Sequence, residues 1–302
     1  MPRRRPRAAR RRIPAEGRAI DGLLLVDKPA GITSHDAVSV ARRALGMRRI
    51  GHAGTLDPFA TGLLVLLIGR ATRLLPHLSG DPKVYEATIR FGSETDTEDL
   101  HGAVIRTAEP PSREAVLAAI PSLTGALDQT PPIYSAKRVG GSRAYDLARS
   151  GVAVELAPVR VRVDRWELLD WRGDECDVRI TCGGGTYVRS LARDLGRLTG
   201  SAAHLSALRR TRSGIFDVRD AVSVERLASE GGGVQPALAA LSEYPSQLLS
   251  SEDVTRVARG IDVAAMVEGA WAALVNEETG VLVALAERRM DRWQPRVVMR
   301  DA

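Results

Sequence analysis

The sequence of 302 residues contains only two cysteines, Cys176 and Cys182, with five residues between them in one strand-like segment. This spacing matches neither a zinc site nor a redox pair, so we interpret both as reduced core thiols. The longest apolar runs, LLLV and LLVLLI, are far shorter than the roughly 20 residues that span a membrane. No apolar segment follows the arginine-rich N-terminus, which argues against a secretory signal, and we expect a cytoplasmic protein without membrane contact.

The sequence also lacks the motifs of several common reaction classes. It has no G-x-x-x-x-G-K-[ST] phosphate loop, no G-x-S-x-G nucleophile elbow, no H-E-x-x-H metal motif and no Cys-x-x-Cys pair. Its five histidines are scattered along the chain and indicate no metal cluster. We therefore predict no metal site.

Lysine is scarce, with three residues against forty arginines. Residues 1–18 hold eight arginines and one glutamate, which gives them a net charge of +7. The whole chain carries +6, so the remaining residues have a net charge of −1 and are nearly neutral. This tail has no apolar periodicity, and we expect it to be disordered. An arginine-rich arm attracts phosphate backbones without reading sequence, although a solvated extension with no specific role explains it equally well.

The order of the predicted elements indicates an α+β fold. Thr33 and Asp36 form a capping-box pattern at the start of a helix over 34–45, which Gly46 ends. A second helix is expected over 111–123 with Ser112 as its cap, and a third after the glycine turn in GGGTYVRSLARDLGRLTG. Strands are predicted at 23–26, 63–68, 83–92, 159–171 and 177–182, and residues 51–62 are predicted as a loop. This order favours a mixed, mostly antiparallel sheet with flanking helices.

The pattern changes after about residue 248. One short helix over 253–260 precedes three strands at 270–275, 281–287 and 295–300. We therefore divide the chain into the tail (1–18), a main domain (19–247) and a small β-rich domain (248–302). Residues 128–151 of the main domain are rich in Arg, Tyr and Gly and have little apolar content to pack, which is typical of a surface loop.

The segment GHAGTLDPFATG, residues 51–62, places a single carboxylate, Asp57, directly before a proline and between glycines. No second acid or base stands beside it in the segment. An aspartate in such a turn is either a structural cap or a reactive group, and the turn by itself favours the cap.

The residues around Asp57 resemble the catalytic loop of the TruB family, the tRNA pseudouridine-55 synthases. Further segments match the motifs of that family in the same order: LLLVDKPAGITSHDAV, KVYEATIRFGSETDTEDLHG, QTPPIYSAKRVGGSRAYDLARSG, GGGTYVRSLARDLG and AHLSALRRTRSG. The resemblance covers nearly the whole chain outside the tail. It implies the central sheet of a pseudouridine synthase catalytic domain and a small C-terminal PUA-like RNA-binding domain.

The resemblance implies that the chain isomerises the uridine at position 55, in the T loop of tRNA, to pseudouridine. That reaction breaks the bond between the sugar and N1, turns the base and rejoins it through C5, so it requires no cofactor. The nucleophile of the family corresponds to Asp57, a carboxylate that is ionised at neutral pH without an adjacent base. Attack at C1′ and attack at C6 both stay open.

The same resemblance assigns further site residues. Tyr85 corresponds to the active-site tyrosine, expected to stack on the target base and to assist proton removal at C5. Arg189 corresponds to the arginine that opposes protonation of the nucleophile, braced by Asp96. His52 matches a histidine that occupies space near the extruded base. The remaining predicted substrate contacts are Lys28, Tyr134, Tyr187 and Arg138, the last of which stands where the family usually carries lysine.

The implied partner is the T stem-loop of tRNA, and we expect a monomer. The resemblance also implies that residues 128–151 are an insertion that closes over the RNA loop. Two alternatives stay open: a non-catalytic RNA-binding or RNA-folding protein on a synthase fold, and a synthase for another T-loop-like RNA. The intact set of Asp57, Tyr85 and Arg189 distinguishes an enzyme from a binder, because a binder has no reason to keep these residues together.

Overall fold

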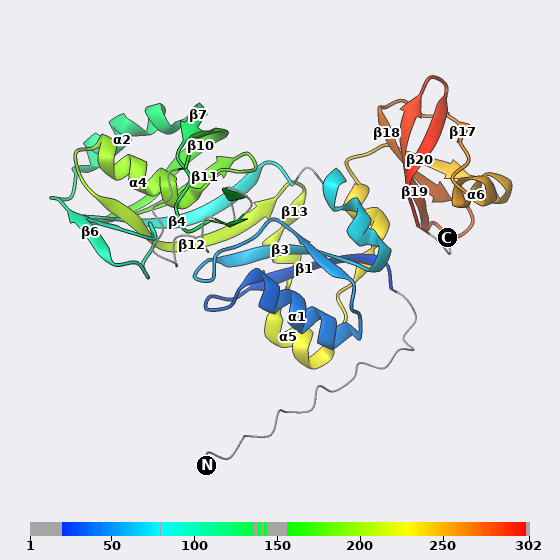
Figure 1. Cartoon of the computed structure of the whole chain (residues 1–302), viewed down its shortest axis with the longest axis horizontal. Coiled ribbons are helices and arrows are strands. Elements are labelled where there is room, and N and C mark those ends of the chain that lie inside the picture. Colours follow the sequence, from blue (N-terminus) through cyan, green and yellow to red (C-terminus); the bar gives the residue numbers. More distant parts are fainter. Residues whose placement is uncertain (1–19, 79, 136–137, 140–141, 144–155, 300–302) are drawn as a thin grey trace, which may run out of the picture.

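The computed structural model describes residues 20–78, 80–135, 138–139, 142–143 and 156–299 (Figure 1). The tail and most of the predicted insertion lie outside these residues. With η marking a 3₁₀ helix, the elements of the main part are β1 (Gly22–Lys28), α1 (Ser34–Leu45), β2 (Ile50–Ala53), β3 (Thr61–Ile68), η1 (Gly69–His77), β4 (Lys83–Phe91), β5 (Ser93–Thr95), β6 (Val104–Thr107), α2 (Arg113–Ala119), η2 (Ile120–Leu123), β7 (Gly125–Gln129), β8 (Arg138–Val139), β9 (Ser142–Arg143), β10 (Val159–Arg172), β11 (Glu175–Cys182), α4 (Val188–Leu198), β12 (Ala203–Ser213), β13 (Phe216–Asp217), η3 (Val218–Asp220), β14 (Val222–Ser223), α5 (Val224–Glu230), β15 (Gln235–Pro236) and η4 (Ala237–Leu241). The C-terminal elements are β16 (Ser246–Leu249), α6 (Ser251–Ala258), β17 (Val263–Ala264), β18 (Trp271–Asn276), β19 (Leu282–Arg289) and β20 (Arg292–Val298).

One large sheet organises the main part of the chain. Its strands follow the order β14-β1-β3-β12-β4-β11-β10-β7, with β2, β13 and β15 pairing at its sides. The β1–β14 and β3–β12 pairs are parallel and the other pairs are antiparallel. The predicted mixed, mostly antiparallel sheet is confirmed.

Residues 23–26 of β1 and 63–68 of β3 are continuous apolar runs because both faces of these strands are buried. On one face, Leu24 and Leu64 pack against α1 and α5. On the other face, Leu23 and Leu63 pack against η4 and the C-terminal strands β18 to β20. This double burial fixes the position of the loop between β2 and β3.

Strands β4 and β11 instead alternate buried and partly exposed residues, because only one of their faces is covered. Tyr85, Ile89 and Val178 point into a core that α2 and α4 complete. Figure 1 shows α2 and α4 over this half of the sheet, with α1 and α5 beneath the β1–β3 half. The active-site tyrosine expected from the sequence therefore faces the same layer as α4.

The capping box of the first helix forms as predicted. Thr33 Oγ1 accepts a hydrogen bond from Asp36 N, the Asp36 carboxylate accepts one from Thr33 N, and Gly46 ends α1 in the left-handed conformation. Ser112 caps α2 as predicted, but α2 ends at Ala119, earlier than expected. The chain continues as the 3₁₀ helix η2 because Pro121 has no backbone N–H to extend an α-helix.

The prediction of a loop over 51–62 is wrong at both ends. Strand β2 includes Gly51, His52 and Ala53, and it pairs with β3, which begins at Thr61. The backbone hydrogen bonds between β2 and the buried strand β3 outweigh the local preference of the glycines for a turn. The loop itself is therefore reduced to residues 54–60.

The C-terminal part forms a separate five-stranded sheet in the order β16-β18-β19-β20-β17, with α6 packed against it. The three predicted strands are confirmed, while the parallel strand β16, which begins at Ser246, was not expected. The domain boundary at residue 248 stays a prediction. No helix among the described residues is both long and apolar enough to cross a membrane.

Candidate active site

A pocket of about 310 Å³ opens at the loop over 54–60. The loop lies where β3 and β12 are joined only through the pairs Thr61–Arg209 and Gly62–Arg210. A side chain at Gly62 would place its Cβ 2.2 Å from the Arg210 carbonyl oxygen, so this junction requires glycine. The pocket is lined by Gly54, Thr55, Leu56, Asp57, Lys83, Tyr85, Ser135, Gly185, Thr186, Tyr187, Val188, Arg189, Leu208 and Arg210.

Lys28 supports the loop from beneath. Its ammonium donates hydrogen bonds to the carbonyl oxygens of Pro29 and Ile32, each at 2.8 Å, and of Pro58, at 3.3 Å. The side chain is completely buried, and this burial lowers its pKa to about 8 against the opposing attraction of Asp57. The Lys28 ammonium thus binds three backbone carbonyls of the loop region, and its predicted contact with the substrate stays a prediction.

Two further contacts hold the loop around Asp57. The Ser34 hydroxyl accepts a hydrogen bond from Leu56 N at 2.9 Å and donates one to Leu56 O at 3.1 Å. The Gly31 N–H donates to Pro58 O at 2.8 Å. The loop is therefore fixed on both sides of the carboxylate, which orients Asp57 before any substrate binds.

Asp57 and Arg189 form the polar centre of the pocket. Arg189 Nε lies 2.9 Å from Asp57 Oδ2, and Nη2 donates to Asp57 Oδ1 at 3.3 Å. The Arg189 side chain is 4% exposed, whereas that of Asp57 is 35% exposed toward the pocket. Burial raises the pKa of Asp57 above its ordinary value, and the Arg189 charge opposes this rise.

The bracing of Arg189 differs from the prediction. Its Nη1 donates to the Thr97 carbonyl at 2.9 Å and lies 3.9 Å from Asp99 Oδ2, while Nη2 donates to the Tyr134 carbonyl at 2.9 Å. Asp96 instead accepts a hydrogen bond from Ala103 N at 2.9 Å. The turn after β5 directs Asp96 across to the β6 side, so Asp99 and not Asp96 is the carboxylate beside Arg189.

Two of the three predicted tyrosines, Tyr85 and Tyr187, line the pocket. Tyr85 is 7% exposed, and burial raises the pKa of its phenol despite the nearby charge of Arg210. The backbone of Tyr187 exchanges two hydrogen bonds with the side-chain amide of Gln129, which fixes the start of α4. The structure therefore brings together Asp57, Tyr85, Tyr187 and Arg189 in one site.

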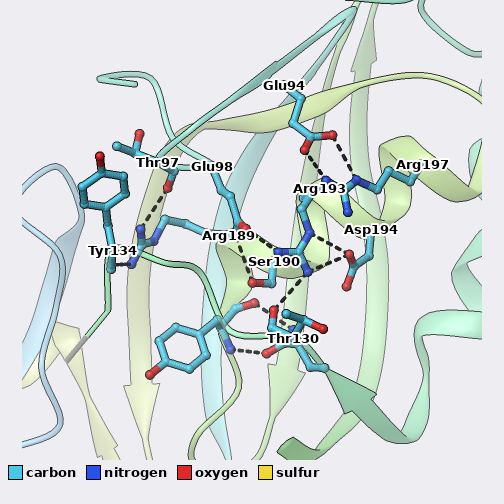
Figure 2. Close-up of polar contacts among 12 residues, drawn as sticks. Glu94, Thr97, Glu98, Thr130, Tyr134, Arg189, Ser190, Arg193, Asp194 and Arg197 are labelled. Carbon is cyan, nitrogen blue, oxygen red and sulfur yellow. Dashed lines mark hydrogen bonds and ion pairs between the residues drawn. The ribbon is translucent and has the colours of Figure 1, made fainter. Parts of the chain in front are cut away.

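The other predicted contacts lie outside the lining. His52 is partly buried on β2, and burial with the nearby Arg210 lowers its pKa. The backbone carbonyl of Tyr134 accepts a hydrogen bond from Arg189, and the Tyr134 ring extends away from Arg189 (Figure 2). Arg138 belongs to β8, and its side chain lies outside the described residues. The roles of these three residues in substrate binding stay predictions.

Arg210 is a site residue that the sequence did not single out. It is 1% exposed, its Nε donates to Leu63 O at 2.8 Å, and Nη2 donates to Gly54 O at 3.1 Å. Nη1 also reaches Thr55 O at 3.5 Å. The only sequence signal is a charged residue at an inward position of a strand, because the contacts themselves join segments about 150 residues apart.

Arg210→Met is expected to lower both stability and activity. The change leaves the Gly54 and Leu63 carbonyls without their donor, which should cost about 3 kcal/mol, and it frees the start of the catalytic loop. Thermal unfolding and single-turnover kinetics measure the two effects. Arg212→Met on the same strand is the control, since the half-exposed Arg212 lies 3.9 Å from Asp217. Equal behaviour of the two variants would contradict the assigned role of Arg210.

No three His, Cys, Asp or Glu side chains gather closely enough to hold a metal ion within the part of the chain that the structure describes. Asp57 is the one carboxylate that lines the described pocket, beside two guanidiniums, one ammonium and two phenols: Arg189, Arg210, Lys83, Tyr85 and Tyr187.

Known proteins resemble most of this chain in sequence. The model of the TruB family pseudouridylate synthase N-terminal domain matches residues 42–188, and that of the tRNA pseudouridylate synthase B C-terminal domain matches residues 189–232. The tRNA pseudouridine synthase B of Thermobifida fusca is 44% identical over 288 residues, covering 92% of this chain and 98% of that protein. The protein of the same name from Mycobacterium sp. (strain KMS) is 44% identical over 294 residues, covering 93% and 97%.

A solved structure shares the fold as well. An H/ACA RNP bound to a substrate RNA containing 2′-deoxyuridine superposes with a TM-score of 0.68 at 23% identity, covering 93% of this chain and 86% of that one. The matched family models and the two relatives extend over both the loop that carries Asp57 and the helix that carries Arg189. This chain therefore belongs to the TruB family of pseudouridylate synthases.

Proposed function

We propose that this enzyme converts the uridine at position 55, in the T loop of tRNA, to pseudouridine, with Asp57 as the nucleophile. The observation that supports this best is the half-exposed carboxylate of Asp57, held by Arg189 at the base of a pocket. The relatives named tRNA pseudouridine synthase B support the choice of tRNA.

The dimensions of the pocket favour a single extruded nucleoside. Its volume of about 310 Å³ lies at the lower end of small-ligand sites and leaves no room for a stacked base pair. A uridine within a folded loop must leave its stack to enter, and recognition then depends on loop shape and on the bases that are splayed out.

Arg189 favours the ionised form of the nucleophile. Without a cation, the burial that raises the pKa of Asp57 would favour the protonated acid, which cannot attack. The carboxylate is then available to form a covalent bond while the link between the sugar and N1 breaks. The base turns, C5 bonds to C1′ of the sugar, and Asp57 is released. The hydrogen on C5 leaves as a proton and N1 takes one up, so that no atom is gained or lost. Attack of Asp57 at C1′ and attack at C6 are both compatible with this scheme.

Tyr85 is suited to stacking on the uracil. Because burial raises the pKa of its phenol, the neutral form is present at neutral pH, and a neutral phenol is a weak base. The contacts at Tyr85 therefore support stacking better than proton removal at C5.

The C-terminal β-rich part and the segment around 128–151 are proposed to hold the RNA outside the pocket, with the enzyme acting as a cytoplasmic monomer. Single-stranded T-loop geometry, rather than base-paired sequence, is the feature that such surfaces recognise.

A substrate comparison tests this proposal against its alternatives. Unmodified tRNA, an isolated T stem-loop and an unrelated messenger RNA hairpin with a similar loop are each incubated with the enzyme, and pseudouridine is counted per molecule. We expect conversion of the first two RNAs and little of the third. Binding of all three without conversion would favour the RNA-binding protein, and preferred conversion of the third would favour another substrate.

Removal of residues 2–18 is expected to weaken RNA association without changing the chemical step. This segment carries a charge of +7, so its loss should flatten the dependence of affinity on salt by counterion release. The rate at saturating tRNA should be nearly unchanged, because the residues of the pocket all lie beyond residue 50. Affinity at two salt concentrations and single-turnover rates measure this. An unchanged salt slope would show that the tail does not contact RNA.

A further inference from the structure

Helix α4 presents three arginines at intervals of four residues toward one short segment. Arg197 pairs with Glu94, Arg193 pairs with Glu98, and Arg189 lies 3.9 Å from Asp99. Figure 2 shows the first two pairs beside Arg189. The segment over 94–99 and α4 are thus joined by successive charge pairs, of which the last reaches the active site.

Glu98 is the unusual member of this set. Its φ is +61°, and among the described residues only Met290 is another non-glycine with positive φ. Met290 is 93% exposed, whereas Glu98 is only 6% exposed. A buried charge on a disfavoured backbone persists only where surrounding contacts require it, and such positions cluster at functional sites.

The carboxylate of Glu98 binds α4 at two places. Oε2 accepts a hydrogen bond from the Ser190 hydroxyl at 2.9 Å, and Oε1 accepts one from Arg193 Nη1. Arg193 Nη2 also donates to the Thr130 carbonyl at 3.0 Å. Glu98 therefore connects its own turn to α4, and through Arg193 to the segment that carries Tyr134.

These connections surround the partners of Arg189. The residue before Glu98 supplies the Thr97 carbonyl, and the residue after it is Asp99. Ser190 follows Arg189 directly in the chain, and the Tyr134 carbonyl is the other backbone acceptor of Arg189. Thr97 and Asp99 are thus the chain neighbours of Glu98, and the Tyr134 carbonyl belongs to the segment that Arg193 binds at Thr130.

We infer that Glu98 is a positioning residue for the reaction: its carboxylate fixes the turn over 95–99 against α4, so that Thr97 and Asp99 direct Arg189 toward Asp57. Glu98 does not line the pocket and acts only through Arg189. The inference rests on the proposed role of Asp57 as nucleophile.

Glu94 provides a matched control within the same set. It is 2% exposed and pairs with Arg197 on the same helix, two turns from Arg189. None of its contacts involves a partner of Arg189, since Glu94 binds Arg197 and lies 3.8 Å from Arg106. A change at Glu94 therefore removes a buried carboxylate that pairs with the same helix, although with a half-exposed arginine, and it leaves the partners of Arg189 in place.

The test compares Glu98→Gln with Glu94→Gln in the full chain acting on unmodified tRNA. Both variants should unfold at a lower temperature than the wild type. We expect Glu98→Gln to lower kcat about tenfold with KM within about twofold, because misplacing a group in the site affects the chemical step more than RNA binding. Glu94→Gln should keep kcat within about twofold of the wild type.

The acidic side of the pH–rate profile gives a readout that a purely structural role would not change. The charged groups facing Asp57 are Arg189 from α4, Asp99 from the turn and Lys28 from β1. A less well placed Arg189 opposes protonation of Asp57 more weakly, so the pKa of Asp57 rises. Because activity falls as the pH drops through this pKa, the acidic limb of Glu98→Gln should move to higher pH by roughly half a pH unit.

Glu98→Gly covers the case in which the glutamine variant fails to fold, because glycine adopts positive φ without strain. It should show the same loss of kcat and the same displaced acidic limb. Equal losses of kcat in Glu98→Gln and Glu94→Gln would overturn the inference. So would a folded Glu98 variant whose pH–rate profile is that of the wild type. A wild-type enzyme that forms no pseudouridine, or an active Asp57→Asn variant, would instead overturn the proposed function.

Discussion

Asp57→Asn is expected to abolish pseudouridine formation, lowering the single-turnover rate by more than about a thousandfold. Asparagine has nearly the same shape and can accept a hydrogen bond from Arg189, but its amide is not a nucleophile. RNA affinity should stay within about tenfold, or about 1.4 kcal/mol, because it depends on phosphate contacts and loop shape. Rates and dissociation constants for one T stem-loop transcript measure both effects.

Asp174→Asn is the control for this change. Asp174 is an exposed residue between β10 and β11 that pairs with Arg90 at 3.5 Å, and its replacement should leave both rate and affinity unaltered. Substantial turnover by a preparation of Asp57→Asn free of wild-type enzyme would show that another group performs the chemistry.

Arg189→Gln has the second largest expected effect, a fall in kcat of about a hundredfold or more. Removing the guanidinium takes away the charge that opposes protonation of Asp57, so the pKa of this carboxyl rises further. The reactive carboxylate is then lost at a higher pH, and the acidic limb of the rate profile moves toward neutrality. Arg189→Lys keeps the positive charge but loses the planar guanidinium that can make two hydrogen bonds to Asp57. Its kcat should lie between those of the wild type and Arg189→Gln.

The same substitution gives a signed prediction for stability. When the folded-state pKa of an acid is raised, the folded state binds protons more tightly, so stability decreases as the pH rises through that interval. Arg189→Gln should therefore lose more stability relative to the wild type at pH 8 than at pH 5. Thermal unfolding at both pH values measures this, and a greater loss of stability at pH 5 would contradict the pairing of Arg189 with Asp57.

Much of the site can be predicted because its motifs are local. The capping box at Thr33, the alternation of β4 that turns Tyr85 inward, and the glycine turn before Arg189 are all set by neighbouring residues. Resemblance to the family then supplied the roles of Asp57, Tyr85 and Arg189, which composition and spacing alone do not give.

The parts that were not predicted depend on contacts between distant segments. Arg210 reaches Gly54, Arg189 reaches Asp99 rather than Asp96, and Glu98 reaches Arg193. Each of these pairs is brought together by the sheet and α4, and no short window of sequence contains both partners. The same reason explains why residues 51–53 belong to β2 and not to the predicted loop, since their strand conformation depends on pairing with β3.

The measurement that tests the account most directly is a map of every uridine in unmodified full-length tRNA, incubated in parallel with saturating wild-type enzyme and with saturating Asp57→Asn. The account predicts pseudouridine at position 55 alone with the wild type, and none at any position with the variant bound to the same RNA. Modification by the wild type at another position, or at position 55 by the asparagine variant, would contradict it.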